Sequence, residues 1–361
     1  MKLSLNWIKD YVKIPEEMDL SKLAYDLTMS TVEVEGAHDL AKDFENIIVG
    51  VICEVLPHPN ADKLRVCKVD IGGEIKDGRC INTPISEIMI SGVCVGSAMY
   101  GMRPVADLQY CDFLFCMMDQ LVNQAAKMRY MSGGQLSVPM VMRCPSGATN
   151  RGAQHAQSPE TFFAHVPGLK VICPSTAYDA KGMMKQAIRD NNPVIVFEHK
   201  LLYGSKRKEV GAINSAGEVP DGDYTVPFGK AAIRREGTDV TIVANLLMNY
   251  KAQEAAAELE KEGISCEIID PRSLLPFDYE TVVESVRKTG KLMIVHEDNY
   301  NCGWGAQVAS YFAENEIFLL DAPIVRIAAK DTPVPFSPDL ENYVIPSKED
   351  IMEAARKLAR A

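Results

Sequence analysis

The pattern of apolar and polar positions changes along the chain, and from about residue 78 it becomes regular. Short continuous apolar runs, typical of strands buried on both faces, are separated there by helix-length amphipathic stretches. The expected strands span residues 103–110, 138–144, 169–175 and 193–199, and the expected helices 117–131 and 177–191. This alternation predicts a parallel sheet covered on both faces by helices.

The same rhythm restarts after a polar stretch, residues 204–223, which is typical of a linker or long loop. We expect strands at 240–244, 266–270, 292–296 and 324–328, and helices ending at Gly263, over 278–289 and over 348–361. The chain is therefore predicted to be α/β, with two consecutive parallel-sheet domains at residues 78–203 and 224–361.

The beginning of the chain has another pattern. Up to about residue 44 it is predicted to be helical, with Leu20, Leu23, Leu27 and Val32 on the apolar face. Strand-like runs follow at 47–52 and 64–69, separated by the turn sequence Pro-His-Pro-Asn. Residues 1–74 are thus expected to form a small α+β head.

Composition narrows the possible roles. A net charge of −11 disfavours nonspecific binding to nucleic acid or to an anionic membrane surface. No apolar run is long enough to span a bilayer, and the start lacks a signal-peptide core. The ten cysteines include no Cys-x-x-Cys pair, which argues against a zinc site or redox dithiol. Buried, reduced thiols and a cytoplasmic location are expected.

One carboxylate stands at a position where chemistry is possible. Glu87 follows Thr-Pro-Ile-Ser and opens a helix whose next turns are small and apolar, from Gly92 to Ala98. Taken alone, a glutamate there need only complement the positive end of the helix dipole.

The motifs that follow Glu87 give it a more specific reading. In order and spacing they resemble the pyrimidine-binding half of the first, decarboxylating component of pyruvate, acetoin and branched-chain 2-oxo acid dehydrogenase complexes. Residues 224–361 resemble the transketolase-type C-terminal domain of the same beta subunits. The matching segments include Met-Arg-Pro-Val (102–105), Asp-Phe (112–113), Tyr-Met-Ser-Gly-Gly (130–134), Gly-Ala-Gln-His-Ala-Gln (152–157), Ile-Ile-Asp-Pro-Arg (268–272) and Gly-Trp-Gly-Ala (303–306).

The resemblance implies thiamine diphosphate as cofactor and assigns three residues to it. Glu87 would share a proton with N1′ of the aminopyrimidine, driving the ring to its imino form so that the 4′-imine takes the proton from C2. Phe113 would pack against that ring, although an ordinary core aromatic is an equally good reading. His155, on a glycine-rich loop, would lie near the substrate-derived intermediate and the incoming lipoyl group.

Other positions match the family with less chemistry attached. His165 and His296 are interpreted as structural. Four residues near the end of the helix expected over 177–191 resemble a potassium site built from backbone carbonyls and one carboxylate, with a strand-entry turn capped by aspartate as the competing reading. They are Ala187, Ile188, Asp190 and Asn192.

The resemblance also implies partners. We find no Gly-Asp-Gly run followed by the Asn that holds magnesium and the diphosphate, which in this family lies on the alpha subunit. The chain is therefore expected to supply half of each active site in an α2β2 assembly, passing acyl groups to a lipoyl-bearing acyltransferase. The segment Glu-His-Lys-Leu-Leu-Tyr, residues 198–203, favours acetoin as substrate over pyruvate.

The head resembles another family. Leu-Ser-Leu-Asn-Trp near the start and Pro-His-Pro-Asn-Ala-Asp-Lys-Leu (57–64) are similar to the N-terminus of the bacterial phenylalanyl-tRNA synthetase beta subunit. Only two strands of its oligonucleotide-binding barrel are present, which argues against tRNA binding. The alternatives are a tRNA-binding module or an inactive fusion.

The dehydrogenase part lacks its family's first helix and first buried strand. Loss of an inner strand is expected to split the parallel sheet and to leave backbone groups unpaired. Residues 47–56 form an apolar run that is suited to fill the vacant strand position.

Overall fold

The computed structural model describes residues 81–203 and 217–361, the backbone of 51–58 and 61–70, and residues 19, 22–25 and 29. It divides into two compact units, Met1–Ile47 and Ile48–Ala361. Residues 22–25 and 29 are helical, as predicted for the start. Most of that predicted helical region, and residues 204–216 of the linker, lie outside the described residues.

The two strands expected in the head are confirmed. β1 (Val51–His58) pairs antiparallel with β2 (Ala61–Asp70), in the register Val51 to Asp70, and the two form a separate two-stranded sheet. The hypothesis that residues 47–56 fill a vacant position in the parallel sheet is therefore wrong for the part of that segment that the structure describes. Its hydrogen bonds go to β2 instead.

The first α/β domain has a sheet in the order β10-β5-β6-β4-β3, in which β5, β6, β4 and β3 are parallel. Its elements are α4 (Glu87–Met99), β3 (Val105–Asp107), the 3₁₀ helix η1 (Cys111–Met117), the π-helix η2 (Asp119–Ala125), α5 (Ala126–Met131), β4 (Val141–Ser146), α6 (Glu160–Ala164), β5 (Lys170–Ile172), α7 (Ala177–Arg189), β6 (Val194–His199) and the 3₁₀ turn η3 (Lys200–Leu202). The sheet is continuous, so the expectation that it is split is wrong; β3 lies at its edge.

The second domain has the order β12-β11-β8-β9-β7, with β7 antiparallel at one edge. Its elements are β7 (Ala232–Arg235), β8 (Val240–Ala244), α8 (Leu246–Glu260), β9 (Cys266–Asp270), α9 (Tyr279–Thr289), β11 (Leu292–Asn299), α10 (Trp304–Asn315), η5 (Ile317–Leu319), β12 (Val325–Ala329), α11 (Pro338–Val344) and α12 (Lys348–Ala359). The strands expected at 240–244 and 266–270 are confirmed to the residue.

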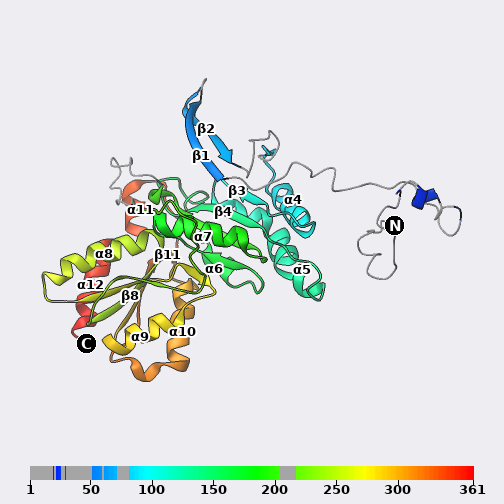
Figure 1. The fold of residues 1–361 in the computed structure, drawn as a ribbon. Helices are drawn as coiled ribbons and strands as arrows, with labels where there is room; N and C mark the ends of the chain where they lie inside the picture. The colour runs from blue at the N-terminus through cyan, green and yellow to red at the C-terminus, as the bar shows by residue number, and fades with distance from the viewer. Residues whose placement is uncertain are drawn as a thin grey trace. The chain divides into compact units, whose positions relative to one another are not determined.

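Successive residues of the central strand of this second sheet enter opposite cores. Ile242 of β8 packs with side chains of α8 and α12, whereas Val243 packs with those of α9 and α10. The two helix pairs accordingly lie on opposite sides of the sheet in Figure 1. Strands buried on both faces explain why the sequence shows continuous apolar runs rather than alternation.

The helix ends follow local sequence signals. Asp278 caps α9 by accepting a hydrogen bond from the backbone N–H of Thr281, and Gly290 ends that helix in the left-handed conformation. Ser347 and Asp350 form a capping box at the start of α12. These signals explain why both helices could be predicted closely.

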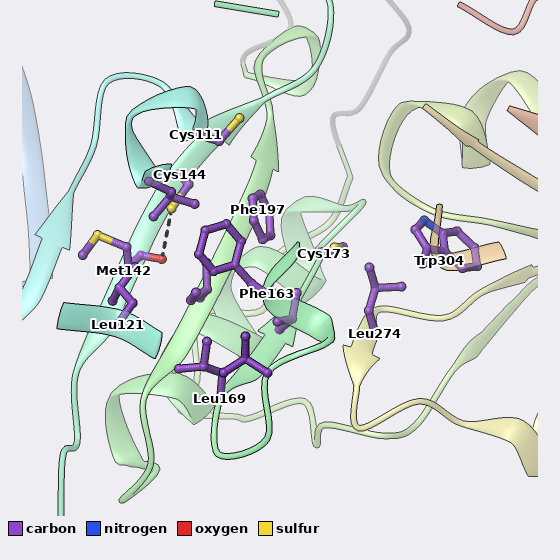
Figure 2. Close-up of a cluster of buried hydrophobic side chains, with 14 of the residues drawn as sticks. Cys111, Leu121, Met142, Cys144, Phe163, Leu169, Cys173, Phe197, Leu274 and Trp304 are labelled. Carbon is purple, nitrogen blue, oxygen red and sulfur yellow. Dashed lines mark hydrogen bonds between the residues drawn. The ribbon is translucent and has the colours of Figure 1, made fainter. Parts of the chain in front are cut away.

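One buried cluster runs through both domains. Figure 2 shows Phe163 and Phe197 of the first domain together with Leu274 and Trp304 of the second. Leu274 lies on β10 (Ser273–Leu275), which pairs antiparallel with β5 and so completes the edge of the first sheet. The sequence did not predict this exchange of a strand between the domains.

The cysteines and the helices bear on two further expectations. Five of the seven cysteines with described side chains are buried, and burial raises the pKa of Cys94 to about 11, but Cys116 and Cys302 are exposed. Burial of every thiol was therefore too broad an expectation. No helix in the described part of the chain is long and apolar enough to cross a membrane.

Candidate active site

Glu87 occupies the first turn of α4, as predicted. Ser86 has the extended backbone of an N-cap but makes no capping hydrogen bond with its side chain. The Glu87 side chain is half-buried, and no group among the described residues forms a hydrogen bond or ion pair with its carboxylate. A carboxylate in this state is available for a ligand.

The surroundings of Glu87 are apolar but open to solvent. Ile85, Ile88 and Val93 are 97%, 58% and 43% exposed. Ser91 and Cys94, four and seven residues after Glu87 and so on the same face of α4, are buried. The buried side of the helix packs against η1 and η2. Residues 117–131, which were predicted as one helix, thus comprise the end of η1, the π-helix and α5, and a π-helical turn of this kind is frequent at functional sites.

The structure brings Phe113 and His155 together. The two rings meet edge to face, with 5.7 Å between their centroids, and Tyr110 packs on the same imidazole at 4.9 Å. Phe113 is half-buried and packs on the hydrophobic core, as an ordinary core aromatic would. Its packing against the aminopyrimidine stays a prediction. Neither ring nitrogen of His155 has a partner among the residues that the structure describes.

The loop that carries His155 is closed on itself and fixed to η1. The backbone N–H of Gly147 donates to the carbonyl of Gln157 at 3.0 Å. The Gln157 side-chain amide in turn donates to Asp112 Oδ1 at 2.8 Å. Tyr110, Asp112 and Gln157 were not predicted as site residues; the only signal was their position next to Phe113 and His155.

The second domain also fixes this loop. Glu297 on β11 accepts a hydrogen bond from the backbone N–H of Ala148 at 2.5 Å, and Glu341 on α11 accepts one from Asn150 at 2.7 Å. Glu297 also contacts His199 Nε2 at 2.9 Å. Burial raises the pKa of Glu297, but the contacts with His199 and Ala148 outweigh it and lower that pKa overall.

The two histidines interpreted as structural differ from each other. His165 is exposed. His296 is buried, and burial lowers its pKa to about 4; its Nδ1 lies 3.1 Å from the carbonyl of Asp298. Its Nε2 is buried without a hydrogen-bond partner among the described residues.

The four residues of the expected potassium site lie together at the end of α7. The backbone N–H of Asn192 donates to Asp190 Oδ1 at 2.9 Å, and the carbonyl of Ala187 accepts from the N–H of Asp190 at 3.2 Å. This is also the geometry of the competing reading, in which Asp190 caps the entry to β6.

Two cationic side chains already contact these oxygens. Lys170 pairs with the Asp190 carboxylate, and Arg103 donates to the carbonyls of Ile188 at 2.9 Å and Asp190 at 2.8 Å. Burial raises the pKa of Asp190, but the Lys170 and Asn192 bonds lower it overall. Potassium binding by these residues stays a prediction.

Comparison with known proteins identifies both domains. Residues 33–206 match the transketolase pyrimidine-binding domain, and residues 229–351 match the transketolase C-terminal domain. The chain is 49% identical over 280 residues to the acetoin:2,6-dichlorophenolindophenol oxidoreductase subunit beta of Cupriavidus necator, covering 77% of this chain and 80% of that protein. It is 43% identical over 283 residues to the 2-oxoisovalerate dehydrogenase subunit beta of Bacillus subtilis, covering 78% and 84%. The pyruvate dehydrogenase E1 component subunit beta of Rickettsia felis is 43% identical over 281 residues, covering 78% and 83%.

The chain belongs to the family of 2-oxo acid and acetoin dehydrogenase beta subunits. Members of this family are oxidoreductase components that work with an alpha subunit, and the main functional prediction is thereby confirmed. A solved structure described as a split-gene transketolase, inactive beta4 tetramer, shares the fold with a TM-score of 0.63 and 25% identity, covering 78% of this chain and 84% of that one.

The match to the pyrimidine-binding domain begins at residue 33, whereas the sequence places the start of that domain at 78. The boundary at 78 stays a prediction. Residues 33–50 lie outside the described structure.

Proposed function

We propose that this beta subunit supplies the aminopyrimidine half of a thiamine diphosphate site, with Glu87 as the residue that holds N1′. The observation that carries the proposal is the half-buried Glu87 carboxylate, which has no hydrogen-bond or ion-pair partner among the described residues and lies beside exposed apolar side chains. It has the chemistry needed to share a proton with an aromatic ring nitrogen at the edge of a protein interface.

Glu87 would act through one proton. Its carboxyl would share this proton with N1′ of the aminopyrimidine and so favour the imino form of the 4′-amino group. When bound, thiamine diphosphate supplies the nucleophilic carbon, C2 of its thiazolium ring.

Phe113 and His155 would complete this half of the site. The Phe113 ring would pack on the aminopyrimidine, and the imidazole of His155, held edge-on by Phe113 and Tyr110, would face the substrate. Its two unpartnered nitrogens allow it to donate or accept a hydrogen bond there.

We further propose an α2β2 assembly in the cytoplasm. The alpha subunit would hold magnesium and the diphosphate, and the product acyl group would pass to a lipoyl-bearing acyltransferase. Acetoin is the substrate we favour, because a relative named for acetoin is 49% identical, against 43% for the 2-oxoisovalerate and pyruvate relatives reported above.

Potassium at Ala187, Ile188, Asp190 and Asn192 is a further part of the proposal. The ion would bind carbonyl oxygens that keep a second lone pair beside the hydrogen bonds described above. Stabilisation by potassium but not sodium in thermal unfolding would support the site, and equal transition temperatures in both salts would oppose it.

For the head, we infer that it resembles the synthetase beta subunit without binding tRNA. β1 and β2 form a two-stranded sheet with no third strand among the described residues, which is too small to make a barrel. Specific tRNA binding that persists in a salt titration would oppose this inference.

The decisive experiment is reconstitution. The full chain is expressed with its alpha subunit, and turnover of acetoin, pyruvate and branched-chain 2-oxo acids is measured with added thiamine diphosphate. Turnover of one of these substrates, dependent on both subunits, is the expected result. A chain that forms the complex but supports no turnover would favour the inactive fusion.

A further inference from the structure

We infer that Lys200 is a positioning residue for His155, which it holds through the backbone carbonyl and through the neighbouring ring of Tyr110. The inference rests on the proposed function for its effect on turnover, whereas the contact itself can be tested without it. Lys200 is the first residue of η3, directly after β6, and was not among the predicted site residues.

The contacts of Lys200 converge on one side chain. Its Nζ donates a hydrogen bond to the carbonyl of His155 at 2.5 Å and lies 4.8 Å from the centroid of the Tyr110 ring. That ring is the one that packs edge to face on the imidazole of His155. One ammonium group therefore restrains both the backbone of His155 and the surface against which its ring rests.

The charge of Lys200 is difficult to explain by packing alone. The residue is buried, and among the described residues its Nζ makes no ion pair within 4 Å of a carboxylate. Burial lowers the pKa of Lys200, while Cys111, Asp112, Glu297 and Glu341 oppose that change from the surrounding elements. Because a buried ammonium is costly, a side chain that only filled space would be better replaced by methionine.

The start of the loop, at Gly147 and Ala148, is held by His199, the residue that precedes Lys200. His199 contacts Glu297, which also accepts the N–H of Ala148. Gly147 permits this arrangement, because its φ is +88° and an added Cβ would lie 2.1 Å from His199 Nε2. Consecutive residues at the end of β6 thus hold the two ends of the loop, His199 by way of Glu297 and Lys200 directly.

The test compares Lys200→Met and Lys200→Arg with a matched control, Lys251→Met. Lys251 is less buried than Lys200 but also donates to a carbonyl, that of Pro346 at 2.7 Å, and among the described residues it forms no hydrogen bond with the His155 loop. Each full-length chain is studied alone by hydrogen exchange over residues 147–157 and, with the alpha subunit, by steady-state kinetics.

Lys200→Met should speed exchange at the His155 and Gln157 amides about tenfold and lower kcat roughly ten- to a hundredfold, with little change in KM. Lys200→Arg, which keeps the charge, should recover part of both. Lys251→Met should change neither, whatever it does to the melting temperature.

Unchanged exchange in Lys200→Met, or a kcat no lower than that of Lys251→Met, would overturn the inference. If Lys200→Met does not fold, the inference is judged on Lys200→Gln, which is one bond shorter and carries no charge, and wild-type exchange and kcat in that variant would overturn it. A His155→Ala variant separates the two proposals. Wild-type turnover in that variant would refute the role proposed for His155, whereas faster loop exchange in Lys200→Met would still support the contact.

Discussion

The two α/β domains have similar sheets but differ in how completely they are covered. Each sheet has four parallel strands and one antiparallel edge strand. In the second domain, helix pairs cover both faces, and β8 and β9 are buried throughout. In the first domain, α4 exposes Ile88, Met89 and Val93 in the turns that follow Glu87. The second domain also exposes apolar side chains, such as Phe318 on η5, so the difference is where they lie: in the first domain they lie on the helix that carries the proposed chemistry.

The largest expected effect is at the first turn of α4. Glu87→Gln should lower turnover in the reconstituted complex by ~10²–10⁴-fold, because an amide cannot share its proton with N1′ as a carboxyl does. Complex formation should be unchanged. The control is Glu280→Gln, in the first turn of α9, whose side chain is 81% exposed. Similar turnover in both variants would show that Glu87 takes no part in the reaction.

The next effect concerns the junction of the two domains. Arg234 on β7 binds Asp270 at 2.7 Å and also pairs with Asp179 on α7, and both carboxylates are fully buried. Arg234→Met should lower the free energy of unfolding by ~3–5 kcal/mol, because it leaves two buried charges underpaired. Urea unfolding measures this loss.

The control for that junction is Arg356→Met, which removes an exposed pair with Glu262 at 2.6 Å. It should change the free energy of unfolding little, because water and salt screen an exposed ion pair. If the two arginine variants lose equal stability, Arg234 contributes no more than a surface ion pair, and the apolar cluster and the pairing of β10 with β5 would hold the domains together.

Titration tests whether the second domain is closed to water. Burial lowers the pKa of His296 to about 4, so stability that is present above pH 6.5 is lost as pH falls towards 4. Burial raises the pKa of Asp298 to about 6, so its contribution has the opposite sign: it is present at low pH and is lost as pH rises through 6. The two effects should nearly cancel in the wild type.

Asp298→Asn should make the loss of stability that follows protonation of His296 measurable. Between pH 6.5 and 4 this variant should lose ~3 kcal/mol of unfolding free energy more than the wild type does. Urea unfolding at several pH values measures the slope. Equal slopes in variant and wild type would mean that the Asp298 carboxyl is not buried as the structure places it. An unfolding free energy of the variant that does not change between pH 6.5 and 4 would mean the same of His296.

The smallest effect tests the uncovered face of the first domain. Ile88→Asp should weaken association with the alpha subunit about tenfold, because the residue next to Glu87 would carry an unpaired charge into the interface. The chain alone should unfold as the wild type does. Phe318→Asp, at a fully exposed position of the second domain, is the control. Equal affinity of both variants for the alpha subunit would mean that this subunit does not bind at the exposed face of α4.

The sequence predicted regular elements best where local signals and burial agree. Strands 240–244 and 266–270 and helix 278–289 were predicted almost to the residue, because continuous apolar runs and strong caps define them. Helix α10 (Trp304–Asn315) was not predicted, although its first residues were recognised as a family motif. The helix expected over 117–131 changes from 3₁₀ to π to α geometry, which apolar spacing does not distinguish.

At the candidate site, the sequence predicted Glu87, Phe113 and His155 through ordered motifs that resemble a known family, and their roles stay predictions. It also determined the α/β class, since apolar runs report burial directly. Only the tertiary structure decided how those residues are held. Lys200 is 45 residues from His155 and Glu297 is 149 from Ala148, and such long-range contacts leave no local pattern. The same holds for β10, whose pairing with β5 depends on how the two domains meet.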